Sequence, residues 1–300
     1  VFQYVPGPGR VIGNVLCQSN QTTGVVFTGS TQTSQIINKN LANRDSASIA
    51  TLVAETGGQN CMVADSSALP EQLVNDVISS AFVSAGQRCS ALRILYVQED
   101  IANNVLKMLA GAMQQMSINH PQYYSTDVGP LIDQAAVTKL NDHVLYMQEQ
   151  GKLIKALEVP AELNGHYFAP HAFEIDSIKQ LKEEIFGPFL HVIRYKAKDI
   201  DQVIEEINST GFGLTFGVHS RINKSIDYII SRIQAGNCYI NRTTIGAVVG
   251  VHPFGGMGLS GTGPKAGGPN YLESFITEKT ITNNVAAVGG NADLLEISED

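Results

Sequence analysis

The chain has 300 residues, of which 43% are hydrophobic, so it is long enough to bury a large core in one or two domains. Its formal net charge is −8 and its basic residues do not cluster, which argues against a protein that binds nucleic acid or a membrane surface. No apolar run approaches the roughly 20 residues of a membrane span, and no secretory signal is visible. We therefore expect a cytoplasmic protein that acts on small molecules. Because it begins without Met, we also expect it to be a piece of a longer chain.

The first part of the chain alternates helix and strand patterns. Apolar residues at helical spacing predict a helix over 10–20, and a β-branched run predicts a strand over 23–30. A second helix is expected over 31–45 and a buried strand over 48–58. This order is typical of a parallel α/β unit. A dinucleotide-binding sheet has about five or six strands, so we expect further strands upstream of this sequence.

The alternation continues through the middle of the chain. Helices are predicted over 69–86, 100–116, 137–151 and 200–210. Strands are predicted over 60–65, 92–98, 167–175, 189–196, 214–220 and 236–241. We expect a mostly parallel sheet with helices on both faces. The end differs, since 251–268 is rich in glycine, 275–285 resembles a strand, and 289–300 is expected to be partly disordered.

The four cysteines are the first candidates for chemistry. They are Cys17, Cys61, Cys89 and Cys238, and they form no CxxC pair, which favours free thiols in a reducing compartment. Cys89 follows a Gly-Gln turn, and the neighbouring Arg88 is expected to favour its thiolate. A lone cysteine is more often an inert buried residue, so both readings remain open on local grounds. The histidines show no metal-binding spacing, and no metal site is expected.

Two strand ends carry polar residues of interest. In "FTGST", Gly29 and Ser30 stand between a strand and a helix, where they would form either a phosphate site or an ordinary serine N-cap. In "LVAETGGQN", Glu55 ends a buried strand, where an apolar setting would raise its pKa towards that of a general base. The alternative for Glu55 is a solvated loop carboxylate. The glycine-rich stretch near the C-terminus indicates either a close backbone approach or a flexible surface loop.

Seven motifs together are more specific than any one of them. They are "FTGST", "AETGGQN", "GQRCS", "DVGPLID", "EEIFGP", "GNCYIN" and "HPFGG". Their identity and order resemble the aldehyde dehydrogenase superfamily. The resemblance implies an α/β fold of mostly parallel sheets with flanking helices, in which an incomplete Rossmann-type NAD domain joins a complete catalytic domain. The implied parts are 1–57 (the end of the NAD domain), 58–260 (the catalytic domain) and 261–300 (a substrate-anchor loop, an oligomerisation strand and a tail).

Three longer stretches point to one branch of that superfamily. "GQRCSA", "NRTTIGAVVGVHPFGG" and "SGTGPKAGGPNYL" are similar to the Δ1-pyrroline-5-carboxylate (L-glutamate γ-semialdehyde) dehydrogenases. "NNVAAVGGNADLL" is similar to the bacterial bifunctional proline-utilisation proteins. The resemblance implies NAD-dependent oxidation of the semialdehyde to L-glutamate through a cysteine thioester, in proline catabolism. It also implies a proline dehydrogenase domain in the same parent chain and a homo-oligomeric parent.

The resemblance implies a role for each matching residue. Cys89 matches the nucleophile and Glu55 the general base, 34 residues apart as in the family. Gly29 and Ser30 match the turn near the NAD pyrophosphate, and Glu184 and Phe186 match the pair beside the nicotinamide ribose and ring.

Five further matches concern the substrate. Ser90 and the backbone of Gly267 and Gly268 match the carboxylate anchor, Phe275 an aromatic wall, and Arg88 a basic position of the branch.

Two family residues precede the stretch where this sequence begins: an asparagine that stabilises the oxyanion and a lysine that contacts the adenine-side ribose. We therefore expect the 300-residue chain alone to have little or no activity. Two alternatives remain, namely another aldehyde dehydrogenase branch with a different substrate, and a non-catalytic folding or oligomerisation module. A cysteine hydrolase is disfavoured, since no histidine lies in a motif that could pair with Cys89.

Overall fold

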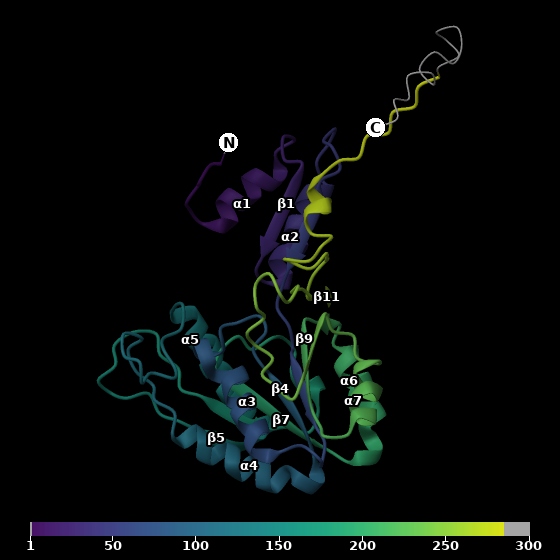
Figure 1. Ribbon diagram of the computed structural model, residues 1–300. Helices are drawn as coiled ribbons and strands as arrows, with labels where there is room; N and C mark the ends of the chain where they lie inside the picture. The colour runs from purple at the N-terminus through teal and green to yellow at the C-terminus, as the bar shows by residue number, and fades with distance from the viewer. Residues whose placement is uncertain (1, 285–300) are drawn as a thin grey trace.

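The chain folds into a small lobe and a large lobe, as Figure 1 shows for a computed structural model that describes residues 2–284. The N-terminal residues and the segment leading to the C-terminus lie together in the small lobe. The residues between them form the large lobe. Each lobe has its own cluster of buried hydrophobic side chains. The backbone therefore crosses between the lobes twice, once in each direction.

The small lobe consists of two helices beside a two-stranded parallel sheet. Its elements are α1 (Gly9–Gln18), β1 (Gly24–Thr28), α2 (Thr31–Ala42) and β2 (Thr51–Glu55). Helix α1 buries Cys17 and α2 buries Ile37 and Leu41, and these three side chains form the centre of the lobe. Val25 and Phe27 of β1 pack against them. The helical and strand periodicities of the sequence thus place one apolar face of each element inwards.

Strand β1 differs from the expected parallel unit in one respect. The strands of a parallel α/β unit are usually covered on both faces, but β1 alternates between exposed and half-buried residues, and Val26 is 56% exposed. The physical reason is that the helices cover only one face of this small sheet, so the opposite side chains meet solvent. Only Val53 and Ala54 of β2 are fully buried.

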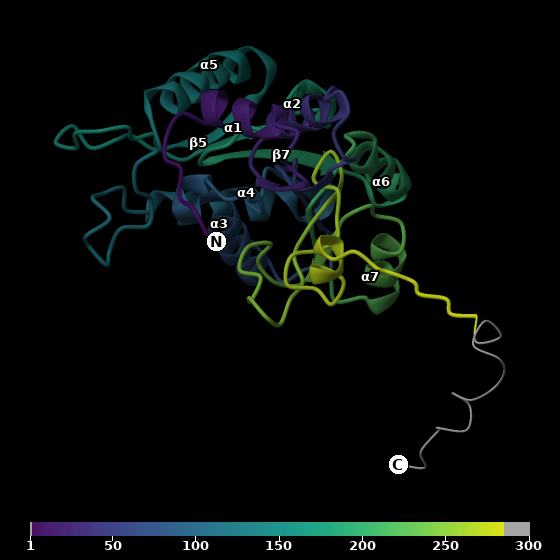
Figure 2. The same cartoon turned by 90° about the horizontal axis from the view of Figure 1, so that it is seen from above.

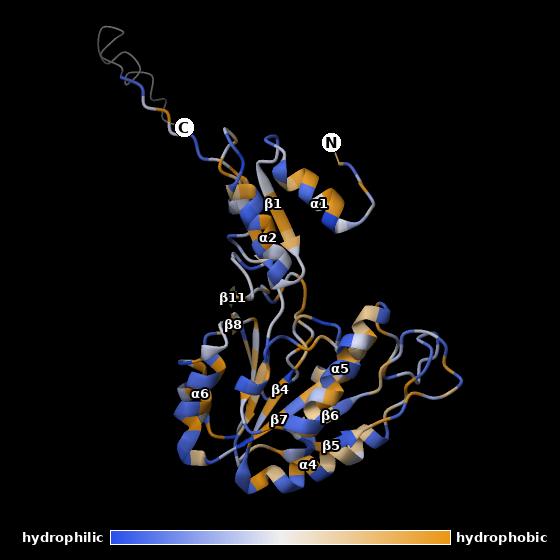
Figure 3. Cartoon of the chain, turned by 180° about the vertical axis from the view of Figure 1, so that it is seen from behind, coloured by the Kyte–Doolittle hydropathy of each residue, from blue (hydrophilic) through white to orange (hydrophobic). Residues whose placement is uncertain are grey.

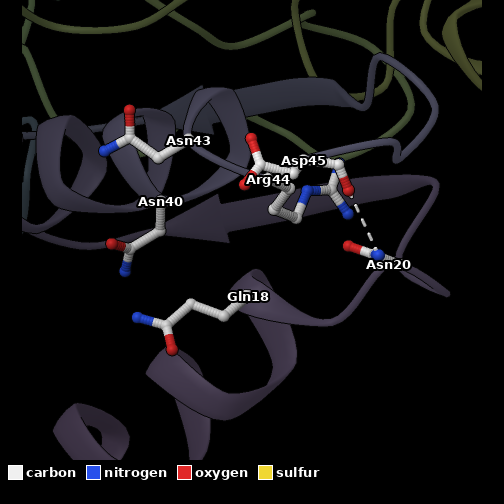
Figure 4. A pocket seen from close by; sticks show the side chains of 6 residues that line it. All are labelled: Gln18, Asn20, Asn40, Asn43, Arg44 and Asp45. Atoms are coloured by element: carbon white, nitrogen blue, oxygen red, sulfur yellow. Dashed lines mark hydrogen bonds between the residues drawn. The ribbon is translucent and has the colours of Figure 1, made fainter.

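A polar hollow of about 350 Å³ lies at the far end of the small lobe, where Arg44 holds the loops together (Figure 4). It is lined by Gln18, Asn20, Asn40, Asn43, Arg44 and Asp45. The Arg44 guanidinium donates to the backbone oxygens of Ser19 (2.8 Å), Thr22 (2.6 Å) and Ser48 (3.1 Å). Because loop carbonyls already occupy these donors, Arg44 serves the fold, and the hollow offers no free cation to a ligand.

The large lobe is built on a seven-stranded sheet in the order β10-β9-β3-β4-β7-β6-β5. These strands are β3 (Cys61–Ala64), β4 (Ile94–Gln98), β5 (Lys152–Ala156), β6 (His171–Glu174), β7 (Phe189–Tyr195), β9 (Thr215–His219) and β10 (Asn237–Ile240). All neighbours are parallel except β5 and β6. Two short strands, β8 (Phe212–Gly213) and β11 (Met257–Gly258), pair separately and antiparallel.

Helices cover the sheet from both sides, as Figure 2 shows. They are α3 (Pro70–Phe82), α4 (Glu99–Gln114), α5 (Gln134–Gln150), α6 (Ile200–Ser209) and α7 (Asn223–Ile230). Helices α3 and α4 pack against each other and against β7. Helix α5 lies on the opposite face (Figure 2), and α6 and α7 lie beside each other, joined by a hydrogen bond from Tyr228 to Asp201 (2.5 Å). Figure 3 shows hydrophobic residues along β4 and β7 and hydrophilic residues on the outer side of α6.

The expected α/β class, the mostly parallel sheet and the helices on both faces are confirmed. Helix α7 and strand β5 were not expected; β5 is an edge strand without a clear apolar alternation. A short 3₁₀-helix (Leu272–Phe275) includes the first residue of the strand-like stretch 275–285, and residues 276–284 pair with no described strand of this chain. The oligomerisation strand implied there would pair with another subunit, so it stays a prediction. Residues 285–300, including the expected tail, lie outside the described residues.

Two buried histidines face each other between α5 and β7. The Nε2 atoms of His143 and His191 are 2.8 Å apart, so one ring donates to the other, and His191 Nδ1 lies 3.1 Å from the backbone oxygen of Arg93. The ring of His143 also meets that of Phe189 edge-on. Burial lowers the pKa of both imidazoles. The pair is therefore neutral in the folded protein at neutral pH.

The histidine pair predicts a specific loss of stability in mild acid. Since the native pKa values lie below the ordinary 6.5, the unfolded chain binds more protons below that pH, and the free energy of unfolding falls as pH decreases. Replacing His143 with Gln keeps a hydrogen bond to His191 but removes one titrating group. Between pH 7.5 and 5, the variant should lose about 1–2 kcal/mol less stability than the unsubstituted protein. Urea unfolding at both pH values measures this.

The exposed His166 provides the control for this measurement. Its replacement with Gln should leave the pH dependence of unfolding unchanged. An equal effect of the substitutions at 143 and 166 would contradict the prediction.

Candidate active site

A cavity of about 1190 Å³ lies where the two lobes meet. The small lobe contributes the residues that follow β1 and β2, and the large lobe contributes residues that precede β4 and β7. Cys89, Glu55, Gly29, Ser30, Glu184 and Phe186 are among its lining residues. The structure therefore brings together six candidates that lie up to 157 positions apart in the sequence.

A fully buried connection, Thr56–Asn60, joins β2 to β3 beneath this cavity. The side-chain nitrogen of Asn60 donates to the backbone oxygens of Cys89 (2.6 Å) and Ala91 (2.9 Å), and its oxygen accepts from the N–H of Thr215 (3.1 Å). Asn60 thus ties together the amino ends of three strands of the large sheet. The site lies at the carboxyl ends of the small sheet, as expected for Glu55, but at the amino ends of the large one.

The turn after β1 forms a serine N-cap and leaves other N–H groups of the first helical turn open. Ser30 Oγ accepts a hydrogen bond from the N–H of Thr33 (3.2 Å), which caps α2. The N–H groups of Thr31 and Gln32, also in this first turn, have no acceptor within the helix, and both residues line the cavity. A Cβ atom on Gly29 would lie 2.4 Å from the ring of Phe27, so a larger residue would require that ring to move. The two readings of "FTGST" are therefore compatible.

Glu55 is half-buried at the end of β2. Its Oε2 accepts from the N–H of Gly256 (3.1 Å), whereas its Oε1 is buried and has no hydrogen-bond partner among the described residues. Burial raises the pKa of this carboxyl to about 7, although the Gly256 hydrogen bond and the charge of Lys265 oppose the rise. A carboxylate with a free oxygen and a pKa near neutrality can exchange protons at physiological pH.

Cys89 is half-buried, and its pKa is raised. Burial is the largest cause, followed by the negative charge of Glu184; hydrogen bonds from the N–H groups of Ser90 and of Cys89 itself oppose them. The expectation that Arg88 favours the thiolate was wrong. Arg88 is exposed, and its Nε donates instead to Ser84 Oγ (2.9 Å). Solvent therefore screens its charge from the Cys89 thiol.

Glu184 and Phe186 lie on the side of the cavity formed by the large lobe. Glu184 Oε1 forms an ion pair of 3.1 Å with Arg93, whose side chain is 2% exposed. Phe186 is 42% exposed, and the Arg93 guanidinium lies 5.1 Å from the centre of its ring. An aromatic ring with an open face beside a fixed carboxylate can hold a planar, hydroxyl-bearing ligand.

The residues expected to bind the substrate lie outside the cavity lining. Ser90 is 7% exposed, and its carbonyl oxygen accepts from the hydroxyl of Thr244 (3.1 Å). The N–H of Gly268 already donates to the backbone oxygen of Lys265 (3.1 Å), and Phe275 stacks edge-on with Tyr271. Of residues 261–275, only Ala266, just before Gly267, lines the cavity in this arrangement.

Several site residues were missed from the sequence. Asn60 and Arg93 are buried polar residues beside strands, and an arginine inside the apolar run "LRILYVQ" was the available signal. Three exposed lysines, Lys139, Lys179 and Lys182, line the cavity, but no motif distinguishes them from ordinary surface residues. Across residues 2–284, no cluster of three metal-ligating acids, histidines or cysteines is found. None of the helices in that range could cross a bilayer.

Comparisons with known proteins show the family to which the chain belongs. The profile of the aldehyde dehydrogenase family matches residues 1–281. The bifunctional protein PutA of Klebsiella aerogenes is 46% identical over 287 residues, which are 93% of this chain and 22% of that protein. A crystal structure of a Bradyrhizobium japonicum proline utilization A (PutA) mutant superposes with a TM-score of 0.90 at 53% identity, covering 94% of this chain and 29% of that one.

A shorter structure is also similar. The 1-pyrroline-5-carboxylate dehydrogenase from Thermus with bound NAD superposes with a TM-score of 0.84 at 31% identity, covering 91% of this chain and 53% of that one. The chain thus spans about a fifth of the curated bifunctional relative and about half of the Thermus enzyme. Since the family profile covers nearly the whole chain, this chain belongs to the aldehyde dehydrogenase family.

Proposed function

We propose that this chain provides the catalytic part of an NAD-dependent enzyme that oxidises L-glutamate γ-semialdehyde, the open form of Δ1-pyrroline-5-carboxylate, to L-glutamate. The observation that carries the proposal is one cavity lined by both the Cys89 thiol and a Glu55 carboxyl whose pKa is about 7. The relatives named PutA and 1-pyrroline-5-carboxylate dehydrogenase support the choice of substrate. The names of the PutA relatives also support a parent chain with a second, proline-oxidising domain.

The side chains support an acyl-transfer sequence through a thioester. Deprotonated Cys89 attacks the aldehyde carbon, forming a C–S bond and an alkoxide. A bound NAD⁺ would supply the hydride acceptor that oxidation of this carbon to a thioester requires. Glu55 removes a proton from a water molecule, the resulting hydroxide attacks the thioester, and the C–S bond breaks to give a carboxylate and the thiol. The unpartnered Oε1 of Glu55 is the atom free to take that proton.

The residues present fit the proposed cofactor. The capped first turn of α2 with Gly29 and Ser30 would hold the pyrophosphate, and Glu184 and Phe186 would hold the nicotinamide ribose and ring. Gly57 has no room for a Cβ atom, which would lie 1.8 Å from Glu184 Oε2, so the backbone is shaped around that carboxylate. All four cysteines are free thiols, which supports a reducing compartment such as the cytoplasm.

The substrate anchor remains a proposal of its own. Ser90, Gly267, Gly268 and Phe275 would receive the substrate carboxylate if the loop that carries the two glycines turned its N–H groups towards the cavity. Gly267 has a φ of +71°, a conformation that leaves glycine free to rearrange where other residues are strained. Arg88, exposed beside Cys89, would add a positive charge at the entrance. We also propose that the active parent is a homo-oligomer.

Substitutions at the two reacting groups, Cys89 and Glu55, test the proposed mechanism. In the full-length protein, Cys89→Ser should lower kcat by about a thousand-fold or more, since a hydroxyl with a pKa far above neutrality replaces the thiol. Glu55→Gln should leave thiol acylation in place and slow the release of product. Reduction of NAD⁺ followed in stopped flow measures both, and a burst followed by a slow phase is expected for Glu55→Gln. Unchanged turnover in either variant would overturn the mechanism.

The same assay tests how much of the family domain is needed. We propose that this 300-residue chain alone has little or no activity, because it spans about half of the Thermus enzyme and its small lobe has only a two-stranded sheet. Extending the chain to the length of that relative should restore turnover. Full activity of the chain alone would contradict this.

Thioester hydrolysis should depend on pH. Glu55 acts as a base only when it is ionised, so the single-turnover hydrolysis rate should fall as pH decreases through about 7. Because Lys265 lowers the pKa of Glu55, Lys265→Met should move the midpoint to higher pH. A pH-independent rate between pH 5 and 8 in the unsubstituted protein would exclude Glu55 as this base.

The alkylation rates of two cysteines distinguish an active site from an inert module. Cys89 and Cys238 are both half-buried thiols with raised pKa values, so Cys238 is a matched internal control. Iodoacetamide should label Cys89 faster than Cys238, and NAD⁺ should change only the Cys89 rate, as followed by peptide mass spectrometry. Equal rates that do not respond to NAD⁺ would favour the non-catalytic module.

A further inference from the structure

Arg93 stands out as a fully buried cation that none of the catalytic steps uses. It lies directly before β4, and only 1% of the residue is exposed. Its Nη1 donates to the backbone oxygens of Gly86 (2.8 Å) and Gly187 (3.2 Å), and its Nη2 donates to the backbone oxygen of Arg88 (3.1 Å) and to Glu184 Oε1 (3.1 Å). One guanidinium therefore joins the segment before Cys89 to the segment that carries Glu184.

The segment before Cys89 needs such support. Ser84, Ala85 and Gly86 are consecutive residues with φ of 58°, 53° and 63°, a left-handed conformation that is unfavourable for Ser and Ala. A strained turn persists only where its surroundings hold it. Arg93 binds two carbonyl groups of this turn, at Gly86 and Arg88. Packing is tight as well, since a Cβ atom on Gly86 would lie 2.1 Å from the backbone oxygen of Gly187.

The Glu184 carboxylate is held on three sides. Arg93 binds Oε1, the N–H of Gly58 also donates to the carboxylate, and Gly57 leaves the only space that fits Oε2. The ring of Phe186 packs near the other side of this ion pair, with its centre 5.1 Å from the Arg93 guanidinium. An isolated buried charge would be costly, but this pair satisfies most of its hydrogen-bonding groups. The carboxylate consequently has one well-defined position at the cavity.

We propose that Arg93 is a positioning residue that holds Glu184 and the Cys89 turn in one arrangement, and thereby couples cofactor affinity on one side of the cavity to thiol reactivity on the other. The identity of the cofactor rests on the proposed function, whereas the coupling rests on the contacts of Arg93. Arginine is required because four acceptors in different directions demand a planar fork of donors. A lysine ammonium in the same place could reach only part of them.

The charges around Cys89 predict the direction in which loss of Arg93 changes the reactivity of the thiol. The negative charge of Glu184 raises the pKa of Cys89, and Arg93 neutralises that charge at 3.1 Å. The other charged groups that act here are Glu55, which also raises the thiol pKa, and Lys139, which lowers the pKa of Glu184. Removing Arg93 therefore exposes the thiol to an unbalanced carboxylate, and alkylation of Cys89 should then require higher pH.

The test uses four variants of the full-length protein: Arg93→Lys, Arg93→Met, Glu184→Gln and the double variant Arg93→Met with Glu184→Gln. Calorimetric titration gives the affinity for NAD⁺, and the pH profile of iodoacetamide alkylation without cofactor reports on Cys89. Both Arg93 variants should weaken NAD⁺ binding by about ten-fold or more, as expected for losing one charge-assisted hydrogen bond. Arg93→Met should move the alkylation midpoint to higher pH. In the Glu184→Gln background, its effect on NAD⁺ affinity should largely disappear.

Three further measurements distinguish positioning from general loss of structure. Arg194 of β7 forms a more exposed ion pair with Glu174 of β6 (2.7 Å), and Arg194→Met should change neither readout. Gly57→Ala displaces Glu184 without touching Arg93, and it should weaken NAD⁺ binding even if Arg93→Met does not fold. Added guanidinium ions should partly restore NAD⁺ binding to an Arg93→Ala variant.

The outcomes separate this proposal from the proposed function. If Glu184→Gln leaves NAD⁺ affinity unchanged, the assignment of Glu184 to the cofactor fails. If Glu184→Gln weakens binding but Arg93→Met and Arg93→Lys do not, only the positioning role of Arg93 fails. Effects of Arg93→Met and Glu184→Gln that simply add, with an unchanged alkylation profile, would likewise overturn the coupling.

Discussion

The arrangement of the site depends on the side-chain amide of Asn60. Its three hydrogen bonds, to the backbone of Cys89, Ala91 and Thr215, hold the amino ends of β3, β4 and β9 together directly below the connection from the small lobe. A buried amide without partners would be strongly destabilising, so this residue specifies the junction as well as stabilising it. Glu55 directly precedes the connection, Asn60 at its end binds the backbone of Cys89, and both Glu55 and Cys89 line a single cavity.

Two carboxylates near that cavity are held in contrasting ways. Glu55 keeps one oxygen free of partners and has a pKa of about 7, whereas Glu184 is fixed by Arg93 and the backbone of Gly58. Burial raises the pKa of both groups, but only Glu184 has a buried cation at hydrogen-bonding distance. A proton acceptor and a binding group can thus have the same chemical identity, since their neighbours decide which role each can play.

Periodicity and turn chemistry allowed the fold class and most elements to be predicted, because the strands of the large sheet are buried on both faces and appear as short apolar runs. Strand β5 and helix α7 escaped prediction, as an edge strand and a short helix have weak patterns. The strand-like stretch after Phe275 pairs with no described strand of this chain, and because a strand needs a hydrogen-bonding partner, the oligomerisation strand implied there stays a prediction. Cys89, Glu55, Glu184 and Phe186 were found as candidates through ordered motifs, whereas Asn60 and Arg93 were not.

By itself, the sequence determined the α/β class, the family resemblance and the identity of the groups able to react. The tertiary structure decided which of them meet. Arg88, adjacent to Cys89 in the sequence, is exposed to solvent, while Arg93, five residues further along the chain, is buried against Glu184. The physical reason is that charge acts through space and through the surrounding dielectric, and both are set by packing between distant segments.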